Sequence, residues 1–315
     1  MSTSLPSNQS QLELPNIYSI ENSEQAFSDA FLKAAQILVQ HLKQILADIG
    51  SIADFTKEPF TLDMLSLFSK MSCHYYSYVL LEIHRDRLGS QFLIEYLRET
   101  AITLAYLLEE GDKYLYSDYV DASVRQARYL LVAVEEQLGR YPDHSDLLSL
   151  KAQMETVISN QKEHVIQSPL TADDAKAGRW GPEDINTTAK RGTVVKLDFL
   201  ANPARQIALR VMPASWLELQ LGGFSSVNGS WSQARPGINF TDLRNAAHLC
   251  LHVAQILLVE VVNYQDINLP DMESQQKSLN ALYEWFHNAH KYQQQCTAAI
   301  QETGSSDIGK HQSVI

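Results

Sequence analysis

The sequence predicts an all-α protein, an irregular multi-helix bundle of about eight helices. Two observations lead to this prediction: apolar residues recur at a 3.6-residue period along most of the chain, and strand-type alternation is almost absent. Of the 315 residues, 45% are hydrophobic, which is enough for a sizeable core. We expect a single helical domain over residues 24–301 with an internal linker near 165–181, flanked by disordered segments over residues 1–23 and 302–315.

Five helices are predicted in the N-terminal half. The first follows Ser23, a plain N-cap, and presents one apolar stripe at helical spacing. This stripe consists of Phe27, Phe31, Ala34, Ile37, Leu38, Leu42 and Ile45. The second helix is expected from Thr61 to about Arg87, and Gly89 is expected to end it. The other three are expected over residues 90–110, 117–138 and 145–164.

The C-terminal half is predicted to begin with a short helix over residues 181–192, with Pro182 in its first turn and Gly192 at its end. Longer helices are expected over residues 203–219, 241–264 and 272–300. Thr241 and Asp242 are the predicted caps of the 241–264 helix, the most apolar of the chain.

Composition restricts the class of protein. A formal net charge of −12 argues against a general binder of nucleic acid or anionic membranes, because such binding depends on Lys and Arg. The three cysteines are far apart and lie in helical patterns, which favours reduced thiols. The first residues lack the pattern of a signal peptide, and no apolar run is long enough to span a membrane. A soluble, cytoplasmic protein without membrane association is therefore expected.

A Gly-rich, polar loop over residues 221–240 leads directly into the apolar 241–264 helix, and we expect the functional site there. The candidate ligand-binding residues of the loop are Ser225, Asn228 and Trp231. The candidate catalytic residues of the helix are Arg244, His248 and His252, which are one turn apart. Nucleophile-elbow, P-loop and dinucleotide motifs are absent from the sequence, so no nucleotide cofactor is expected.

A metal site is the next possibility, because His248 and His252 are helical neighbours, and Glu284, His287 and His290 continue the pattern on the last helix. A di-iron bundle needs two E-x-x-H pairs, and the sequence has one, formed by Glu284 and His287. Zinc motifs with paired cysteines are also absent. We therefore predict no metal and no other cofactor.

Glu95, Arg98 and Glu99 lie on an otherwise apolar helix, where charges are costly unless they are paired. We favour a buried ion pair that fixes the register of the helix. The alternative is a ligand site in which Arg98 and Glu99 are binding residues, together with Arg244 from another helix.

Residues 176–244 carry nine positive and five negative side chains in an otherwise acidic chain. Trp180, Trp216, Phe224 and Trp231 are interleaved with these charges, a combination found on phosphate- or RNA-binding surfaces. The alternative, which we favour, is a solvated face with uneven charge.

Three motifs carry a family resemblance that covers roughly Phe68 to Val262. They are Arg98-Glu99 before an apolar Tyr-Leu-Leu run, Trp180 with a short helix ending Lys190-Arg191-Gly192, and the loop Ser225–Trp231 before a long apolar helix. In this order they resemble an uncharacterised, all-helical bacterial family of unknown function.

That family is itself similar to the HEPN helical domains of bacterial defence and toxin systems. The resemblance implies a dimer and, in catalytic members, a ribonuclease with an Arg and a His at a short spacing in a shared cleft. Here Asn228 stands where the family more often has His, and Glu95 stands near the position of an Arg. In the catalytic members the Arg and the His are four to six residues apart. Here three residues separate Arg244 from His248 and seven separate Arg244 from His252, so neither pair has that spacing. The resemblance thus implies a non-catalytic or diverged member.

The resulting hypothesis is a soluble, homo-oligomeric helical protein of defence or stress type, which binds RNA or a protein partner. The first alternative is a ribonuclease that uses Arg244 with His248 or His252. The second is a metal-binding helical bundle.

Overall fold

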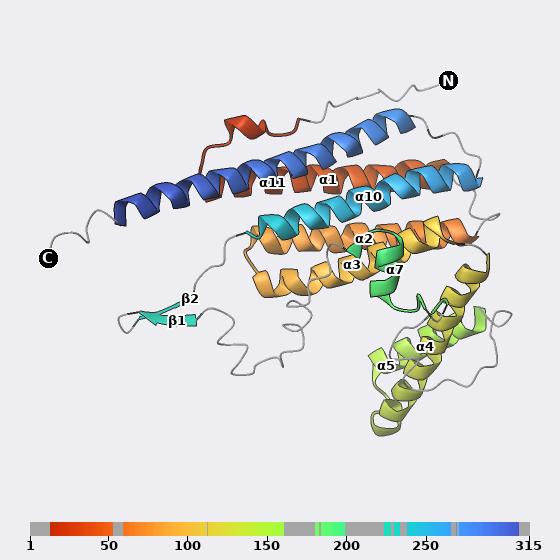
Figure 1. Cartoon of the computed structure of the whole chain (residues 1–315). Helices are drawn as coiled ribbons and strands as arrows, with labels where there is room; N and C mark the ends of the chain where they lie inside the picture. The colour runs from red at the N-terminus through yellow and green to blue at the C-terminus, as the bar shows by residue number, and fades with distance from the viewer. Residues whose placement is uncertain are drawn as a thin grey trace, which may run out of the picture. The chain divides into compact units, whose positions relative to one another are not determined.

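The computed structural model describes residues 13–52, 59–111, 113–160, 180–182, 184–198, 224–227, 230–233, 238–265, 269 and 271–308. Its elements are η1 Ile17–Ser19, α1 Glu24–Ile52, α2 Pro59–Ile83, α3 Arg87–Glu109, α4 Lys113–Arg140, α5 Ser145–Asn160, α7 Thr188–Val194, β1 Phe224–Val227, β2 Ser230–Gln233, α10 Phe240–Gln265 and α11 Met272–Ile308 (Figure 1). The prediction of an all-α bundle of about eight helices is confirmed, since eight α-helices lie within the described residues.

The chain divides into two compact units, Met1–Leu104 with Phe199–Ile315, and Ala105–Asp198. The division falls inside α3. Residues 161–179, which include most of the predicted linker, lie outside the described part of the chain. The expected single domain over residues 24–301 stays a prediction.

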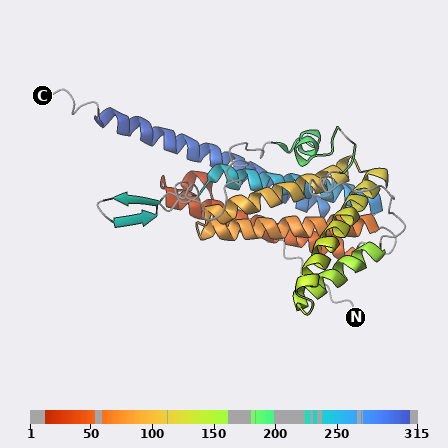
Figure 2. The ribbon, with the colours of Figure 1, turned by 90° about the horizontal axis from the view of Figure 1, so that it is seen from below.

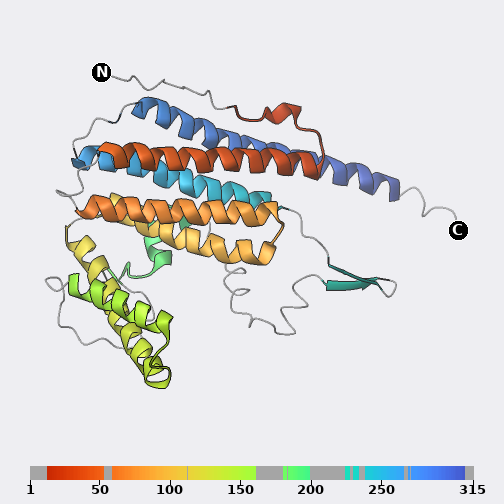
Figure 3. The same cartoon turned by 180° about the vertical axis from the view of Figure 1, so that it is seen from behind.

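In the first unit, α10 contacts α1, α2 and α11, and these four helices run side by side (Figures 1 and 3). Neighbours on several sides explain why α10 is apolar around much of its circumference: Leu249, Cys250 and Leu251, which point in three different directions, are all fully buried. A helix of this kind is stabilised mainly by the apolar area that it removes from water.

An aromatic cluster joins α1, α10 and α11. The ring of Phe31, which is fully buried, lies 5.1 Å from Phe240, 5.4 Å from Trp285 and 6.1 Å from Phe286, measured between ring centroids. The contacts are tilted or edge-to-face, the orientations that aromatic pairs prefer. The apolar stripe predicted for the first helix is therefore its core-facing side.

The predicted N-cap of the first helix is confirmed, because the amide of Ala26 donates to Ser23 Oγ at 3.2 Å. The residues before it differ from the prediction. Asn16 caps the 3₁₀ turn η1, and Trp285 Nε1 donates to the carbonyl of Pro15 at 2.7 Å, which ties this segment to α11. Residues 1–12 of the predicted disordered segment lie outside the described residues.

The boundary between the second and third helices also differs. Arg85, two residues after the end of α2, takes a left-handed conformation with φ of 57°, and Asp86 Oδ1 accepts from the amide of Gly89 at 3.0 Å. Gly89 thus lies in the first turn of α3 and does not end the preceding helix. Glycine identity alone predicted a stop, but the N-cap of Asp86 decided the boundary.

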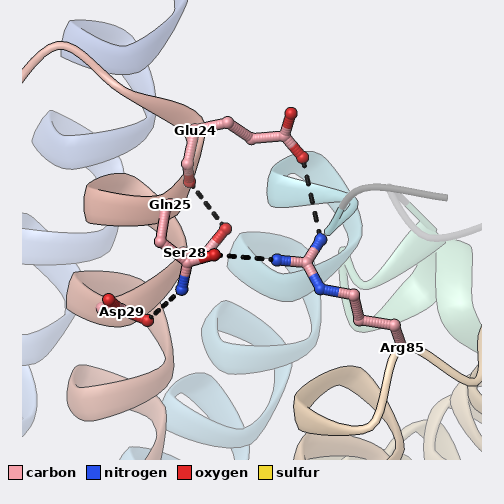
Figure 4. A network of polar contacts seen from close by, with 5 residues as sticks. All are labelled: Glu24, Gln25, Ser28, Asp29 and Arg85. Atoms are coloured by element: carbon pink, nitrogen blue, oxygen red, sulfur yellow. Dashed lines mark hydrogen bonds and ion pairs between the residues drawn. The ribbon is translucent and has the colours of Figure 1, made fainter. Parts of the chain in front are cut away.

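Arg85 also connects this turn to the start of α1 (Figure 4). Its guanidinium lies 3.9 Å from Glu24 Oε1 and donates to Gln25 Oε1 at 3.3 Å. Gln25 in turn donates to Asp29 Oδ1 at 2.8 Å. Pairs this exposed contribute little free energy, but they orient the turn against α1.

The cap of α10 lies two residues before the first predicted one, Thr241. Asn239 accepts from the amide of Asp242 at 3.1 Å, and its own amide group donates to Asp242 Oδ2 at 2.7 Å. This reciprocal arrangement resembles a capping box. Thr241, the other predicted cap, is already inside the helix, and its hydroxyl is therefore available to α11.

The loop expected over residues 221–240 contains an antiparallel hairpin, in which β1 pairs with β2 and Ser226 lies opposite Trp231. At the other end of the chain, α11 continues to Ile308, past the expected end near residue 300. Residues 309–315 and the helix predicted over residues 203–219 lie outside the described part.

In the second unit, α5 lies alongside α4 (Figures 2 and 3). The short helix predicted over residues 181–192 is instead α7, capped by Thr187, whose hydroxyl accepts from the amide of Lys190. Pro182 and the acidic residues after it therefore precede the helix. Gly181 has a φ of 81°, which a residue with a side chain rarely adopts.

We predict that Phe31→Ala lowers the free energy of unfolding of the first unit by about 4 kcal/mol, because it removes a fully buried ring from the aromatic cluster. Denaturant unfolding followed by tryptophan fluorescence measures the change. Leu62→Ala on α2, where 48% of the residue is exposed, is the matched control and should cost much less. Equal losses in the two variants would contradict the central role of the cluster.

Candidate functional site

The α10–α11 site consists of Thr241, Arg244, Asn245 and His248 on α10 with Tyr283 and His290 on α11. It lies where the first turns of α10 pass the middle of α11. Four-residue spacing puts Arg244 and His248 on the same face of α10, as the sequence predicted. The two helices contact each other, so polar side chains on this face must find their partners on α11.

His290 is the centre of the site, with only 4% of its surface exposed. Its Nδ1 lies 3.1 Å from Arg244 NH1, and its Nε2 lies 3.0 Å from Thr241 Oγ1. A guanidinium can only donate, so Nδ1 must be the acceptor. In a neutral imidazole the hydrogen is then on Nε2, which donates to the hydroxyl of Thr241. Both ring nitrogens of His290 are thus engaged.

Arg244 is held by neutral groups. Its Nε and NH2 donate to Asn245 Oδ1 at 3.1 and 2.6 Å, and its NH1 donates to His290. Within the described part of the chain, no carboxylate lies at ion-pair distance from this guanidinium. The site therefore contains a fixed positive charge whose protein partners do not neutralise it.

His248 lies one turn further along α10 and is 8% exposed. Its ring stacks on Tyr283, with the centroids 4.1 Å apart and the planes at 19°. Nε2 lies 3.3 Å from the carbonyl of Tyr283, which can only accept, so Nε2 carries the hydrogen and Nδ1 is left with a lone pair.

Both histidines are neutral at physiological pH. Burial lowers the pKa of His248 from 6.5 to about 4, and the positive charge of Arg244 adds to this effect, while the hydrogen bond to Tyr283 opposes it. Burial, followed by Arg244 and His287, lowers the pKa of His290 to about 4 as well. A general acid is most effective when its pKa is near the working pH, so neither imidazole is suited to donate a proton at pH 7.

The structure brings some of the predicted site residues together and not others. Arg244 and His248 belong to the α10–α11 site, whereas His252, whose pKa burial also lowers, has no hydrogen bond within the described residues. Ser225 and Trp231 lie on the two strands of the hairpin, and the structure describes their backbone. Asn228 lies outside the described residues.

The favoured ion pair on the third helix is present, between Arg98 and Glu95. Arg98 Nε and NH2 lie 3.1 and 3.0 Å from Glu95 Oε2, with the side chains 10% and 17% exposed. Glu99, predicted as a ligand-binding residue with Arg98, is exposed on α3 and does not join this pair. The arrangement favours a structural role for Arg98, and its assignment as a ligand-binding residue stays a prediction.

Part of the predicted basic surface is buried. In the second unit, Arg191 is 2% exposed and lies over the ring of Trp180 at 4.2 Å, and Trp180 is itself 7% exposed. Tyr106 and Tyr119 flank the same indole at 5.8 and 5.2 Å. At these two residues the favoured prediction of a solvated face is wrong, and neither residue is accessible to RNA; they anchor α7 to α3 and α4 instead.

Four residues of the site, Thr241, Asn245, Tyr283 and His290, were not predicted as members of it, and Thr241 was considered only as a helix cap. His290 was considered only as a possible metal ligand, and Tyr283 was not singled out. Their partners lie more than 30 positions away in the sequence. Helical spacing identifies which residues share a face of one helix, but not which face of another helix they meet.

Among the described residues, no three His, Cys, Asp or Glu side chains are grouped so that they could hold a metal ion. In the same part of the chain, no helix is both long and apolar enough to cross a membrane.

Comparisons with known proteins add no relative. No family model matches the sequence, and neither a curated protein nor a solved structure is significantly similar to it.

We predict that Arg98→Met destabilises the first unit by about 3 kcal/mol, because it leaves the carboxylate of Glu95 buried without its cation. One oxygen of that carboxylate, Oε1, already lacks a hydrogen bond within the described residues. Urea unfolding measures the loss. Glu95→Leu combined with Arg98→Met should recover most of it, and equal destabilisation of the single and double variants would contradict this account.

We also predict a pH dependence of stability. An unfolded histidine takes up a proton near pH 6.5, but folded His248 and His290 do so only near pH 4. Proton uptake therefore favours the unfolded chain in this window: the full contribution of the neutral histidines is present above pH 6.5 and is lost as the pH falls towards 4.

The urea midpoints of wild type and His248→Phe, compared at pH 7 and pH 5, test this dependence. The phenyl ring keeps the stack on Tyr283 but cannot be protonated, so the variant should lose less stability between the two pH values. His144→Gln, at an exposed position in the second unit, is the control and should follow the wild type. The same loss in His248→Phe as in wild type would contradict the assignment.

Proposed function

We propose that the protein is an RNA-binding protein that holds a phosphate group of single-stranded RNA at the α10–α11 site without cleaving it. The observation that carries this proposal is Arg244, a half-buried guanidinium held by His290 and Asn245, with no carboxylate partner within the described residues. Guanidinium groups are well suited to phosphate because they present several donors in a fixed plane.

Two further features support an anionic ligand. Arg244 lies in the first turns of a 26-residue helix, where the helix dipole is positive and favours negative charge. The hydroxyl of Thr241 accepts from His290, so its own hydrogen can be donated to a ligand, and the residue is exposed. With a net charge of −12, the chain as a whole repels RNA, which confines binding to a local site of this kind.

The protonation states favour binding over cleavage. Metal-independent cleavage of RNA needs one group that removes a proton and another that supplies one. Both nitrogens of His290 are engaged, and His248 offers only the lone pair of Nδ1, with a pKa of about 4. The ribonuclease that uses Arg244 with His248 or His252 is thus the less favoured alternative. On the sequence motifs, we further propose that the chain is a diverged HEPN-like protein.

We predict that Arg244→Gln weakens binding of a fluorescein-labelled single-stranded RNA about tenfold at fixed salt. It should also reduce the slope of log K against log salt by about one, the loss of one phosphate contact. Fluorescence anisotropy measures both. Arg85→Gln is the matched control, because Arg85 has a carboxylate partner in Glu24, and it should bind as the wild type does. Arg244→Lys should retain part of the affinity.

The RNA is recovered after binding and examined on a denaturing gel. Intact RNA is expected. Cleavage that disappears in His248→Ala would favour the ribonuclease alternative. If the wild type does not retain RNA at low salt, the proposal is wrong.

A further inference from the structure

The hairpin of α4 and α5 leaves much apolar surface exposed. None of residues 145–159 on α5 is buried, and Leu148, Leu150 and Val157 are 48%, 37% and 44% exposed. On α4, Val132 is 56% exposed. A helix of 16 residues gains little stability without tertiary burial, so a hairpin with this surface favours a further layer of helices.

One exposed row on α4 has a regular order of charges. Arg128, Val132 and Glu136 follow one another at intervals of four residues, so they form a single line along the helix. Arg128 and Glu136 are both exposed, and among the described residues neither has an ion-pair partner. The neighbouring Glu135 differs, because it pairs with Lys151 of α5 at 3.0 Å.

We propose that this row binds the same row of a second copy of the chain, with the two α4 helices antiparallel about a two-fold axis at Val132. Arg128 precedes Val132 by four residues and Glu136 follows it by four. Reversing the helix about Val132 therefore places Arg128 of each copy opposite Glu136 of the other, on both sides of a Val132–Val132 contact. A two-fold interface uses the same patch on both subunits, and this patch is complementary to itself.

Charge favours a second copy in this orientation. A parallel arrangement would oppose Arg128 to Arg128 and Glu136 to Glu136, which is repulsive. Two chains of net charge −12 also repel each other in general, so self-association needs a face that supplies its own positive charge. Two hairpins that meet in this way bring four helices together, the arrangement in which amphipathic helices bury their remaining apolar side chains.

We predict that the full-length protein is a dimer in sedimentation equilibrium and that Arg128→Glu and Glu136→Arg each weaken the dimer at least about tenfold, since each opposes two pairs of like charges. The double variant Arg128→Glu/Glu136→Arg rebuilds both pairs with reversed sign and should dimerise within about threefold of wild type. This restoration is expected only when the partner is another copy of the same helix. Circular dichroism checks that every variant is folded.

Cysteine cross-linking tests the position of the axis in a background where the exposed Cys73 is replaced by serine. Val132→Cys should form a disulfide-linked dimer on mild oxidation. Leu130→Cys is the matched control, because it is also exposed but points to the opposite side of α4, and it should stay unlinked. A monomer at all concentrations, single reversals without effect, a double variant that stays as weak as the single ones, or equal cross-linking at the two positions would each overturn the proposal.

Discussion

Burial of α10 between α1, α2 and α11 is the constraint on which the rest of the first unit depends. A helix with neighbours on several sides buries a large apolar area, and this burial offsets the free-energy cost of ordering the chain. Any polar group on such a helix must find a hydrogen-bond partner within the protein. Arg244 and His248 are such groups: Arg244 donates to Asn245 on α10 and to His290 on α11, and His248 pairs with Tyr283 on α11. The α10–α11 site is thus a consequence of placing polar residues on the most buried helix.

The electrostatics of the site follow from the same burial. Removing imidazoles from water disfavours their charged form, and a nearby guanidinium disfavours it further. His290 and His248 are therefore neutral, and their hydrogen-bonding roles are fixed by partners that can only donate or only accept. A single positive charge remains, on Arg244. This division between one cation and neutral neighbours is suited to holding an anion and poorly suited to transferring protons.

The second unit shows why a count of charges can mislead. Arg191 and Trp180 belong to a basic, aromatic-rich segment whose composition is found on RNA-binding surfaces. In the structure, however, these two side chains stack on each other in the interior of the unit. A guanidinium over an indole ring is a common way to bury a cation at low cost. On α4, by contrast, the order of the exposed charges along the helix is informative, because Arg128 and Glu136 lie at equal distances on either side of Val132.

The sequence by itself determined the helical class, the stripe of α1 that faces the core, and the pairing of polar residues on single helices, because these depend on a period of 3.6 residues and on local charge. It also placed Arg244 and His248 on one face of α10. It missed the boundary at Gly89, the cap at Asn239 and the hairpin at Phe224–Gln233, where the hydrogen bonds of the chain override simple residue preference. Only the tertiary structure decided that Arg244 meets His290 and that His248 stacks on Tyr283. The physical reason is that the helical period predicts which residues share one face of a helix. The packing of the whole core decides which residues of another helix that face contacts.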